Sequence, residues 1–365
     1  MPTRLPALIA ALFALAAPVS AQAPPKVDDT PVDTKEVGFT TADGMDIQGT
    51  LYKAVKNASD APCVILLHSF GKDPNKGDWG GLAKTLARKG FNTLRFDFRG
   101  HGKSTIISDT NLFWSDPTNV AAFPSLARKK PLPNKLELKD VTTARGGYFP
   151  QLANDILAAR VDLDKRNDAG EVNTGSVYLI GATDAATLDM LYMIAEWTRP
   201  QVLPQAVHLL TLPPNRFQVP PNSDMAGKDI AGTVWLSPVR HPSVDKDVMK
   251  RWVQAYTDIR AKNAALYVYG ADDKQGKATS TYILDEVLVA KPSDKKLNPM
   301  RFTGAFEVKG TKNTGVDLLG NALGTEEEIV KYLETVEKDR KNITKTANRN
   351  YTKPPLIVPA AFGIR

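Results

Sequence analysis

The residues of this sequence that could do chemistry are centred on the stretch 181–185, which reads Gly-Ala-Thr-Asp-Ala. An apolar run at 177–180 precedes it and predicts a strand, and apolar residues at helical spacing from Leu188 onward predict a helix after it. A hydroxyl residue, Thr183, therefore stands on a sharp strand-to-helix turn, with a small residue two positions before it and another two positions after it. A hydroxyl held in this way can act as a nucleophile toward an acyl group, whereas a plain turn would use the same small residues without any chemistry.

A hydroxyl nucleophile needs two further groups, an imidazole that accepts its proton and a carboxylate that orients the imidazole. A carboxylate is available at Asp273, which ends a Gly-x-x-Asp pattern after an apolar run at 265–269, although turns also favour Asp for structural reasons. The imidazole is harder to place, because the chain has 4 histidines and none of them follows His241. The sequence thus predicts a hydroxyl and an acid without a recognisable base.

The elements that must position these groups alternate between strands and helices. A hairpin around Asp43-Gly44 opens the folded part of the chain. The expected strands are then 62–67, 92–97, 177–180, 231–237, 265–269 and 300–308, and the expected helices include 79–89, 151–166, 244–260, 277–289 and 326–341. This alternation predicts an α/β domain with a mostly parallel central sheet and helices on both faces. Irregular stretches at about 106–147 and 199–229 predict lid-like insertions.

Two motifs in the N-terminal half carry a resemblance to a known superfamily. The run LLHSFGKD at 66–73 ends one predicted strand, and the run LRFDFRGHGKS at 94–104 contains the end of the next one. Together with the turn at 181–185, they resemble the α/β-hydrolase fold superfamily, in particular its serine-aminopeptidase and dienelactone-hydrolase-like branches. The resemblance extends over residues 36–341 and implies the α/β-hydrolase fold for this chain.

The resemblance also implies which positions would form a catalytic site. The nucleophile position is Thr183, the acid position is Asp273, and the base position, just after the last strand, is Thr314. The backbone N–H groups of Phe70 and Asp184 would form the oxyanion hole. The similar hydrolases carry serine at the first position and histidine at the third, so this chain retains only the acid of the triad.

These replacements favour a catalytically inactive protein that acts in binding or scaffolding. A threonine nucleophile needs an adjacent base, and β-branched residues tolerate a strained turn badly, so we expect Thr183 to relax the turn. The alternative is an active esterase or peptidase that uses Thr183 and an unrecognised base, for which His68 and His208 are the candidates. A shifted register would make Asp184 the nucleophile, again without a base. His101 belongs to the second motif and is expected to shape a turn.

The N-terminal residues have the pattern of an export signal. Arg4 precedes an apolar run, and small residues at 20–23 offer cleavage sites, so a secreted or periplasmic protein is expected. The run is shorter than a membrane-spanning helix requires. The expected organisation is a signal peptide at 1–23, a flexible leader at 24–35, an α/β-hydrolase-fold domain at 36–341 and an extended tail at 342–365.

Composition argues against several classes of function. The formal net charge of +7 is spread along the chain without a basic stripe interleaved with aromatic residues, so nucleic acid is not an expected partner. No cluster of His, Asp or Glu has metal-ligand spacing and Cys63 is the single cysteine, so we expect neither a metal nor another cofactor. The expected partner is a small molecule in a pocket under the 199–229 insertion, with the oligomeric state left open. A cell-envelope structural protein that binds through its tail and the loop around Lys129 is a third alternative.

Overall fold

The fold is that of a computed structural model, which describes residues 29–145, 147–202, 224–256, 258–288, 302–340 and 348–364. The described residues from Pro31 onward belong to one compact unit. The expected signal peptide, His208 and most of the 199–229 insertion lie outside the described residues. The expectation of a pocket beneath that insertion therefore falls outside them as well.

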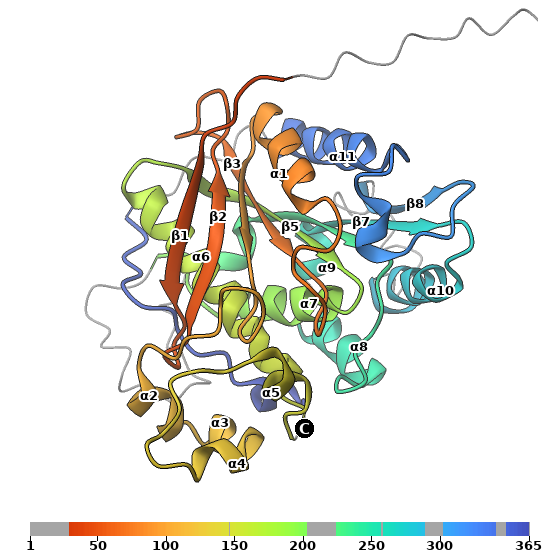
Figure 1. The fold of residues 1–365 in the computed structure, drawn as a ribbon. Coiled ribbons are helices and arrows are strands. Elements are labelled where there is room, and N and C mark those ends of the chain that lie inside the picture. Colours follow the sequence, from red (N-terminus) through yellow and green to blue (C-terminus); the bar gives the residue numbers. More distant parts are fainter. Residues whose placement is uncertain are drawn as a thin grey trace, which may run out of the picture. The chain divides into compact units, whose positions relative to one another are not determined.

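An eight-stranded sheet forms the centre of this unit (Figure 1). Its strands are β1 (Thr34–Thr40), β2 (Asp46–Tyr52), β3 (Pro62–Leu67), β4 (Asn92–Phe96), β5 (Asn173–Ala182), β6 (Ile230–Leu236), β7 (Ala264–Gly270) and β8 (Gly304–Val308). They lie in the order β1-β2-β4-β3-β5-β6-β7-β8, and all neighbours are parallel except at β2, which runs antiparallel to both β1 and β4. This confirms the predicted mostly parallel sheet, whose central strands are buried along nearly their whole length, as continuous apolar runs predict.

Helices cover both faces of the sheet, as the alternation of elements predicts (Figure 1). One face carries α1 (Trp79–Arg88) and α11 (Thr325–Arg340), whose apolar residues pack in one hydrophobic cluster with the sheet. The other face carries α6 (Ala153–Asp168), α7 (Ala185–Glu196) and α8 (Lys246–Ala255) in a second, larger cluster. Strand β3 contributes side chains to both hydrophobic clusters, because Val64 and Leu66 lie in the first cluster and Ile65 and Leu67 lie in the second.

Two helices in the C-terminal half of the chain begin or end at other residues than the sequence predicts. The helix expected at 244–260 is divided into α8 and α9 (Asp258–Lys262), because the backbone at Tyr256 leaves the helical conformation. The helix expected at 277–289 begins earlier, as α10 (Lys274–Tyr282), and continues as a turn of π-helix at Ile283–Leu288. Its early start has a local cause, since the Asp273 carboxylate caps the helix by accepting the Gly276 N–H.

The first insertion contains four short helices, α2 (Thr110–Ser115), α3 (Pro117–Ala122), α4 (Pro124–Ala127) and α5 (Leu138–Thr142). Its attachment to the domain centres on Arg99, which belongs to the second sequence motif and is fully buried. The guanidinium forms ion pairs with Asp43 of the hairpin and Asp155 of α6, each at 2.7 Å. It also donates to the Tyr148 hydroxyl at 2.8 Å. Asn119 of α3 donates to the same Asp43 carboxylate at 3.0 Å, so this network ties the hairpin, the insertion and α6 together.

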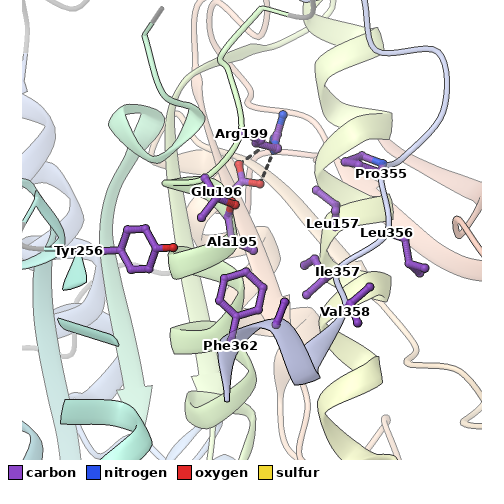
Figure 2. Close-up of a pocket in the computed structure, with 12 residues that line it drawn as sticks. Leu157, Ala195, Glu196, Arg199, Tyr256, Pro355, Leu356, Ile357, Val358 and Phe362 are labelled. Atoms are coloured by element: carbon purple, nitrogen blue, oxygen red, sulfur yellow. Dashed lines mark hydrogen bonds and ion pairs between the residues drawn. The ribbon is translucent and has the colours of Figure 1, made fainter. Parts of the chain in front are cut away.

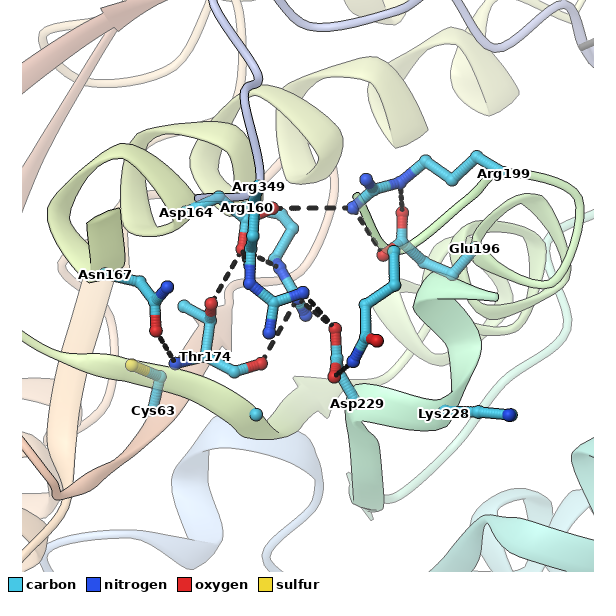
Figure 3. A network of polar contacts seen from close by, with 12 residues as sticks. Cys63, Arg160, Asp164, Asn167, Thr174, Glu196, Arg199, Lys228, Asp229 and Arg349 are labelled. Carbon is cyan, nitrogen blue, oxygen red and sulfur yellow. Dashed lines mark hydrogen bonds and ion pairs between the residues drawn. The ribbon is translucent and has the colours of Figure 1, made fainter. Parts of the chain in front are cut away.

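The C-terminal segment 348–364 is anchored to the domain by a buried network of charges (Figure 3). Arg349 is fully buried and pairs with Asp229 at 2.6 Å and with Asp164 at 3.3 Å. The same two carboxylates also hold Arg160, at 2.7 and 3.0 Å. The segment has one short helical turn at Pro359–Phe362 and is otherwise irregular, yet its apolar residues join the second hydrophobic cluster. It is therefore part of the packed domain.

Candidate active site

The turn after β5 has the strained backbone of a nucleophile elbow. Thr183 has a φ of +53°, in the left-handed region that β-branched residues rarely adopt. Two backbone hydrogen bonds hold it there: its N–H donates to the Leu236 carbonyl (2.9 Å), and its own carbonyl accepts the Val239 N–H (3.0 Å). The expectation that Thr183 would relax the turn is therefore wrong, because the end of β6 and the loop after it fix both sides of the residue.

The backbone also decides which residue stands at the elbow. Asp184 has helical angles, with φ at −74° and ψ at −18°, and is the cap residue of α7. The strained position therefore belongs to Thr183. The shifted register, with Asp184 as the nucleophile, does not match this geometry.

The Asp184 carboxylate is hydrogen-bonded to a backbone N–H that the resemblance assigns to an oxyanion hole. Its Oδ1 accepts this N–H, that of Phe70, at 3.0 Å. Burial raises the pKa of this carboxyl, while hydrogen bonds from the Phe70 N–H, the Thr183 hydroxyl and the backbone N–H groups of Asp184 itself and Ala185 act in the opposite direction. The Phe70 N–H is thus already used within the protein, and a substrate carbonyl would not find it free.

The Thr183 side chain turns its hydroxyl toward Ser69 and Asp184 and its methyl toward the base position. Its Oγ1 lies 2.7 Å from Ser69 Oγ and 3.2 Å from Asp184 Oδ1. A Cβ placed on Gly315 would lie 2.7 Å from Thr183 Cγ2, so the methyl packs directly against the residue that follows Thr314.

The other two triad positions lie on loops at the same edge of the sheet. Thr314 is exposed and precedes the short helix Gly315–Leu318. Asp273 is buried, its Oδ1 accepts the Gly276 N–H at 2.8 Å, and its Oδ2 has no hydrogen-bond partner among the described residues. In an active triad the second oxygen would hold the imidazole. Here the acid caps a helix and lacks that partner.

His68, one of the two candidate substitute bases, has both ring nitrogens engaged. Its Nδ1 donates to the Ser69 carbonyl at 2.9 Å, and its Nε2 accepts the Phe98 N–H at 3.0 Å. Burial lowers the pKa of this ring to about 3, so it is neutral. It has no free nitrogen with which to take a proton from Thr183. The other candidate, His208, lies outside the described residues.

His101 shapes the turn of the second motif, as the sequence predicts. Its Nδ1 donates to the Arg99 carbonyl at 3.0 Å, and its Nε2 accepts the Gly71 N–H at 2.9 Å. Burial lowers the pKa of this ring too. The ring thus links the turn to the loop after β3.

A cavity of about 240 Å³, here called the elbow cavity, opens beside Thr183. Its wall is formed by the loop after β3, the elbow, the loop after β6 and the loop after β8: His68, Ser69, Phe70, Lys72, Asp73, Lys76, Thr183, Asp184, Val239, Thr314, Val316 and Asp317. Three of these residues are carboxylates and two are lysines. Its volume suits a small molecule or one end of a larger ligand.

His241 lies close to this cavity without lining it, and the sequence patterns did not single it out. Its ring stacks on Phe149, with centroids 3.7 Å apart, and meets the Phe70 ring edge-on at 5.8 Å. Its Nδ1 is hydrogen-bonded to the Ser243 hydroxyl at 2.7 Å, and burial together with Arg240 lowers its pKa to about 4. Its place in the loop after a parallel strand is the feature that could have pointed to it, because ligands bind at the carboxyl ends of such strands.

A second, smaller cavity lies between α7 and the C-terminal segment (Figure 2). It measures about 140 Å³, and much of its wall is apolar, with Leu157, Ile357 and Phe362 among the lining residues. Its polar lining includes Glu196, whose two carboxylate oxygens both accept from Arg199. Since that charge is already compensated, the elbow cavity is the stronger candidate for a functional site.

The described residues offer neither a metal centre nor a membrane span. No group of three or more His, Cys, Asp or Glu side chains within them is placed to hold a metal ion. No helix in the described part of the chain is both long and apolar enough to cross a bilayer. Cys63 is buried, and burial raises the pKa of its thiol to about 12, so it packs as an unreactive core residue.

Comparison with known proteins matches part of the sequence to one fold family. A family model described as alpha/beta hydrolase fold matches residues 62–167. The uncharacterized protein YfhR of Escherichia coli K12 is 31% identical over 74 residues, which cover 20% of this chain and 26% of YfhR. The chain therefore spans about a quarter of the length of the curated relatives that it matches.

Solved structures with a similar backbone arrangement include those of two enzymes. An esterase from Pyrococcus furiosus has 14% identity and a TM-score of 0.47, with 83% of this chain and 91% of that chain covered. A dienelactone hydrolase from Anabaena variabilis has 12% identity and a TM-score of 0.43, with 86% and 99% covered. Similarities this weak carry no information about a shared activity.

Proposed function

We propose that this chain, which has the α/β-hydrolase fold, is an exported protein that binds a small molecule in the elbow cavity and does not hydrolyse it. The observation that carries the proposal is the Asp184 carboxylate bound to the Phe70 N–H at 3.0 Å. A hydrolase of this fold must offer that N–H to the oxygen of a tetrahedral intermediate. Loss of one such donor typically costs about 10²–10³ in rate.

The residue at the base position supports the same proposal. The base position holds Thr314, whose side chain has no group that titrates near neutral pH, so nothing there can take the proton of the nucleophile. Both the base position and the Asp184 carboxylate would have to change before acyl transfer could proceed at an enzyme's rate.

An active hydrolase that uses Thr183 is the second candidate, and the strained backbone at this residue favours it. A residue held in such a conformation costs of order 1–3 kcal/mol, and strain of this kind clusters at functional sites. In this candidate the Asp184 carboxylate, whose Oδ1 lies 3.2 Å from Thr183 Oγ1, would accept the hydroxyl proton. The carboxylate would then have to leave the Phe70 N–H before an acyl oxygen could enter.

The two candidates are separated by labelling the purified protein with a fluorophosphonate probe and assaying it with short-chain p-nitrophenyl esters. The matched control is Thr183→Ala, with folding of both proteins checked by circular dichroism. We expect neither labelling nor turnover above the level of the Thr183→Ala variant. Turnover that is present in the native chain and absent from the variant would establish the active candidate instead.

A further inference from the structure

The elbow cavity presents hydrogen-bond acceptors where a hydrolase presents donors. The Phe70 N–H is already used by Asp184, so it is not available to a ligand. Ser69 Oγ, Thr183 Oγ1 and the Asp184 carboxylate stand beside one another on the cavity wall, with 2.7 Å between the two hydroxyl oxygens and 3.2 Å between Thr183 Oγ1 and Asp184 Oδ1. The polarity of this corner is therefore opposite to that of an oxyanion hole.

The hydrogen bonds within this group leave lone pairs for a ligand. An ionised carboxylate only accepts hydrogen bonds, and each hydroxyl has one proton and two lone pairs. The Phe70 N–H and the Thr183 hydroxyl both approach Oδ1 of Asp184, so Oδ2 takes no part in either contact. Each of the three side chains can therefore accept a further donor.

The charges of the cavity wall also favour a positively charged ligand. Lys76 forms an ion pair with Asp317 at 2.9 Å, and Lys72 is next to Asp73 in the chain on the exposed rim. These four residues together are neutral. Asp184 is the remaining charge, and no ion pair to it is formed among the described residues.

We propose that the elbow cavity binds its ligand through a primary ammonium group, which lies against Ser69, Thr183 and Asp184. The inference rests on the proposed function, because it requires the cavity to be a binding site. An ammonium has three N–H donors and a positive charge, which match three acceptors and one uncompensated carboxylate. A carboxylate ligand would meet the charge of Asp184 and would not find the Phe70 N–H free, and an alcohol would leave the charge uncompensated.

Three small probes of similar size test this selectivity: n-butylammonium, butyrate and 1-butanol. Each is titrated into the full protein, and binding is followed by saturation-transfer NMR. We expect n-butylammonium to bind at least about tenfold more tightly than either of the others, the ratio that corresponds to about 1.4 kcal/mol. Asp184→Asn, which keeps the shape and removes the charge, should lose about tenfold of the n-butylammonium affinity, whereas Asp60→Asn, at an exposed position outside the cavity, should change it less than about twofold.

Three results would overturn the inference: equal binding of butyrate and n-butylammonium, no binding of any probe, or an unchanged affinity in a folded Asp184→Asn variant. If that variant fails to fold, Ser69→Ala removes one acceptor and should weaken n-butylammonium severalfold without affecting butyrate. Ester turnover that depends on Thr183 would contradict the proposed function in a separate assay. Failure of the inference and failure of the proposed function are thus distinguishable.

Discussion

Asp189 on α7 is a buried carboxyl whose charge the fold does not compensate. Its side chain is fully buried, Oδ2 accepts the Trp235 indole N–H at 2.6 Å, and Oδ1 has no hydrogen-bond partner among the described residues. Burial raises its pKa to about 7, whereas an Asp in an unfolded chain has a pKa of about 3.9. The replacement Asp189→Asn keeps an oxygen for Trp235 and cannot ionise.

The sign of the effect follows from the two pKa values of Asp189. Because the folded-state pKa is the higher one, the folded protein keeps this proton over a range in which the unfolded chain has lost it. The resulting stabilisation is complete below about pH 3.9 and is lost as the pH rises to about 7, at about 1.4 kcal/mol per pH unit. The whole shift corresponds to about 4 kcal/mol, of which about 2 kcal/mol is lost between about pH 5 and pH 7.

Urea unfolding, followed by tryptophan fluorescence, measures this dependence for the native chain and for Asp189→Asn from about pH 5 to pH 8. We expect the free energy of unfolding of the variant, relative to the native chain, to rise by about 3 kcal/mol over this range. Burying the amide of the variant in place of the carboxyl has a free-energy cost that does not depend on pH, so it does not contribute to the change with pH. Asp60→Asn, at an exposed position, is the control and should show no such change.

A difference between native chain and variant that stays constant with pH would refute this reasoning. It would mean that Asp189 ionises in the folded protein as easily as in the unfolded chain. The Asp60→Asn control separates that result from a general effect of removing one negative charge, because it makes the same charge change at the surface.

Two further predictions concern the contacts that hold the tail and the elbow. Replacing Arg349 with Met removes a guanidinium shared by two buried carboxylates. We therefore expect the free energy of unfolding, measured in urea, to fall by about 3–5 kcal/mol. The control is exposed Lys353→Met, and a loss no larger than that of the control would count against a role for the network. Gly315 has a φ of +55°, and Gly315→Ala would place a Cβ 2.7 Å from the Thr183 methyl. We therefore expect this variant to lower the free energy of unfolding by about 1–3 kcal/mol. The loss should be smaller in a Thr183→Ser background, and equal losses in both backgrounds would show that the methyl contact is not the cause.

The sequence alone determined the class of the fold and what the site lacks. Apolar runs such as 62–67 and 265–269 mark strands that are buried on both faces, because hydrophobic periodicity is a local property of the chain. The turn at Thr183 and the acid at Asp273 were located by their place after such strands. The absence of any histidine after His241 was also plain from the sequence, and it removes the usual base whatever the fold does.

Only the tertiary structure decided how the remaining groups of the site are used. The bond from the Phe70 N–H to the Asp184 carboxylate joins residues 114 positions apart, and no local pattern shows that a side chain uses this N–H. The strain at Thr183 persists because the end of β6 holds it, which propensity at that residue does not reveal. Arg349 is likewise buried because α6 and Asp229 bring carboxylates to it. These features depend on free energies of contact between distant elements, and such contacts exist only once the sheet has formed.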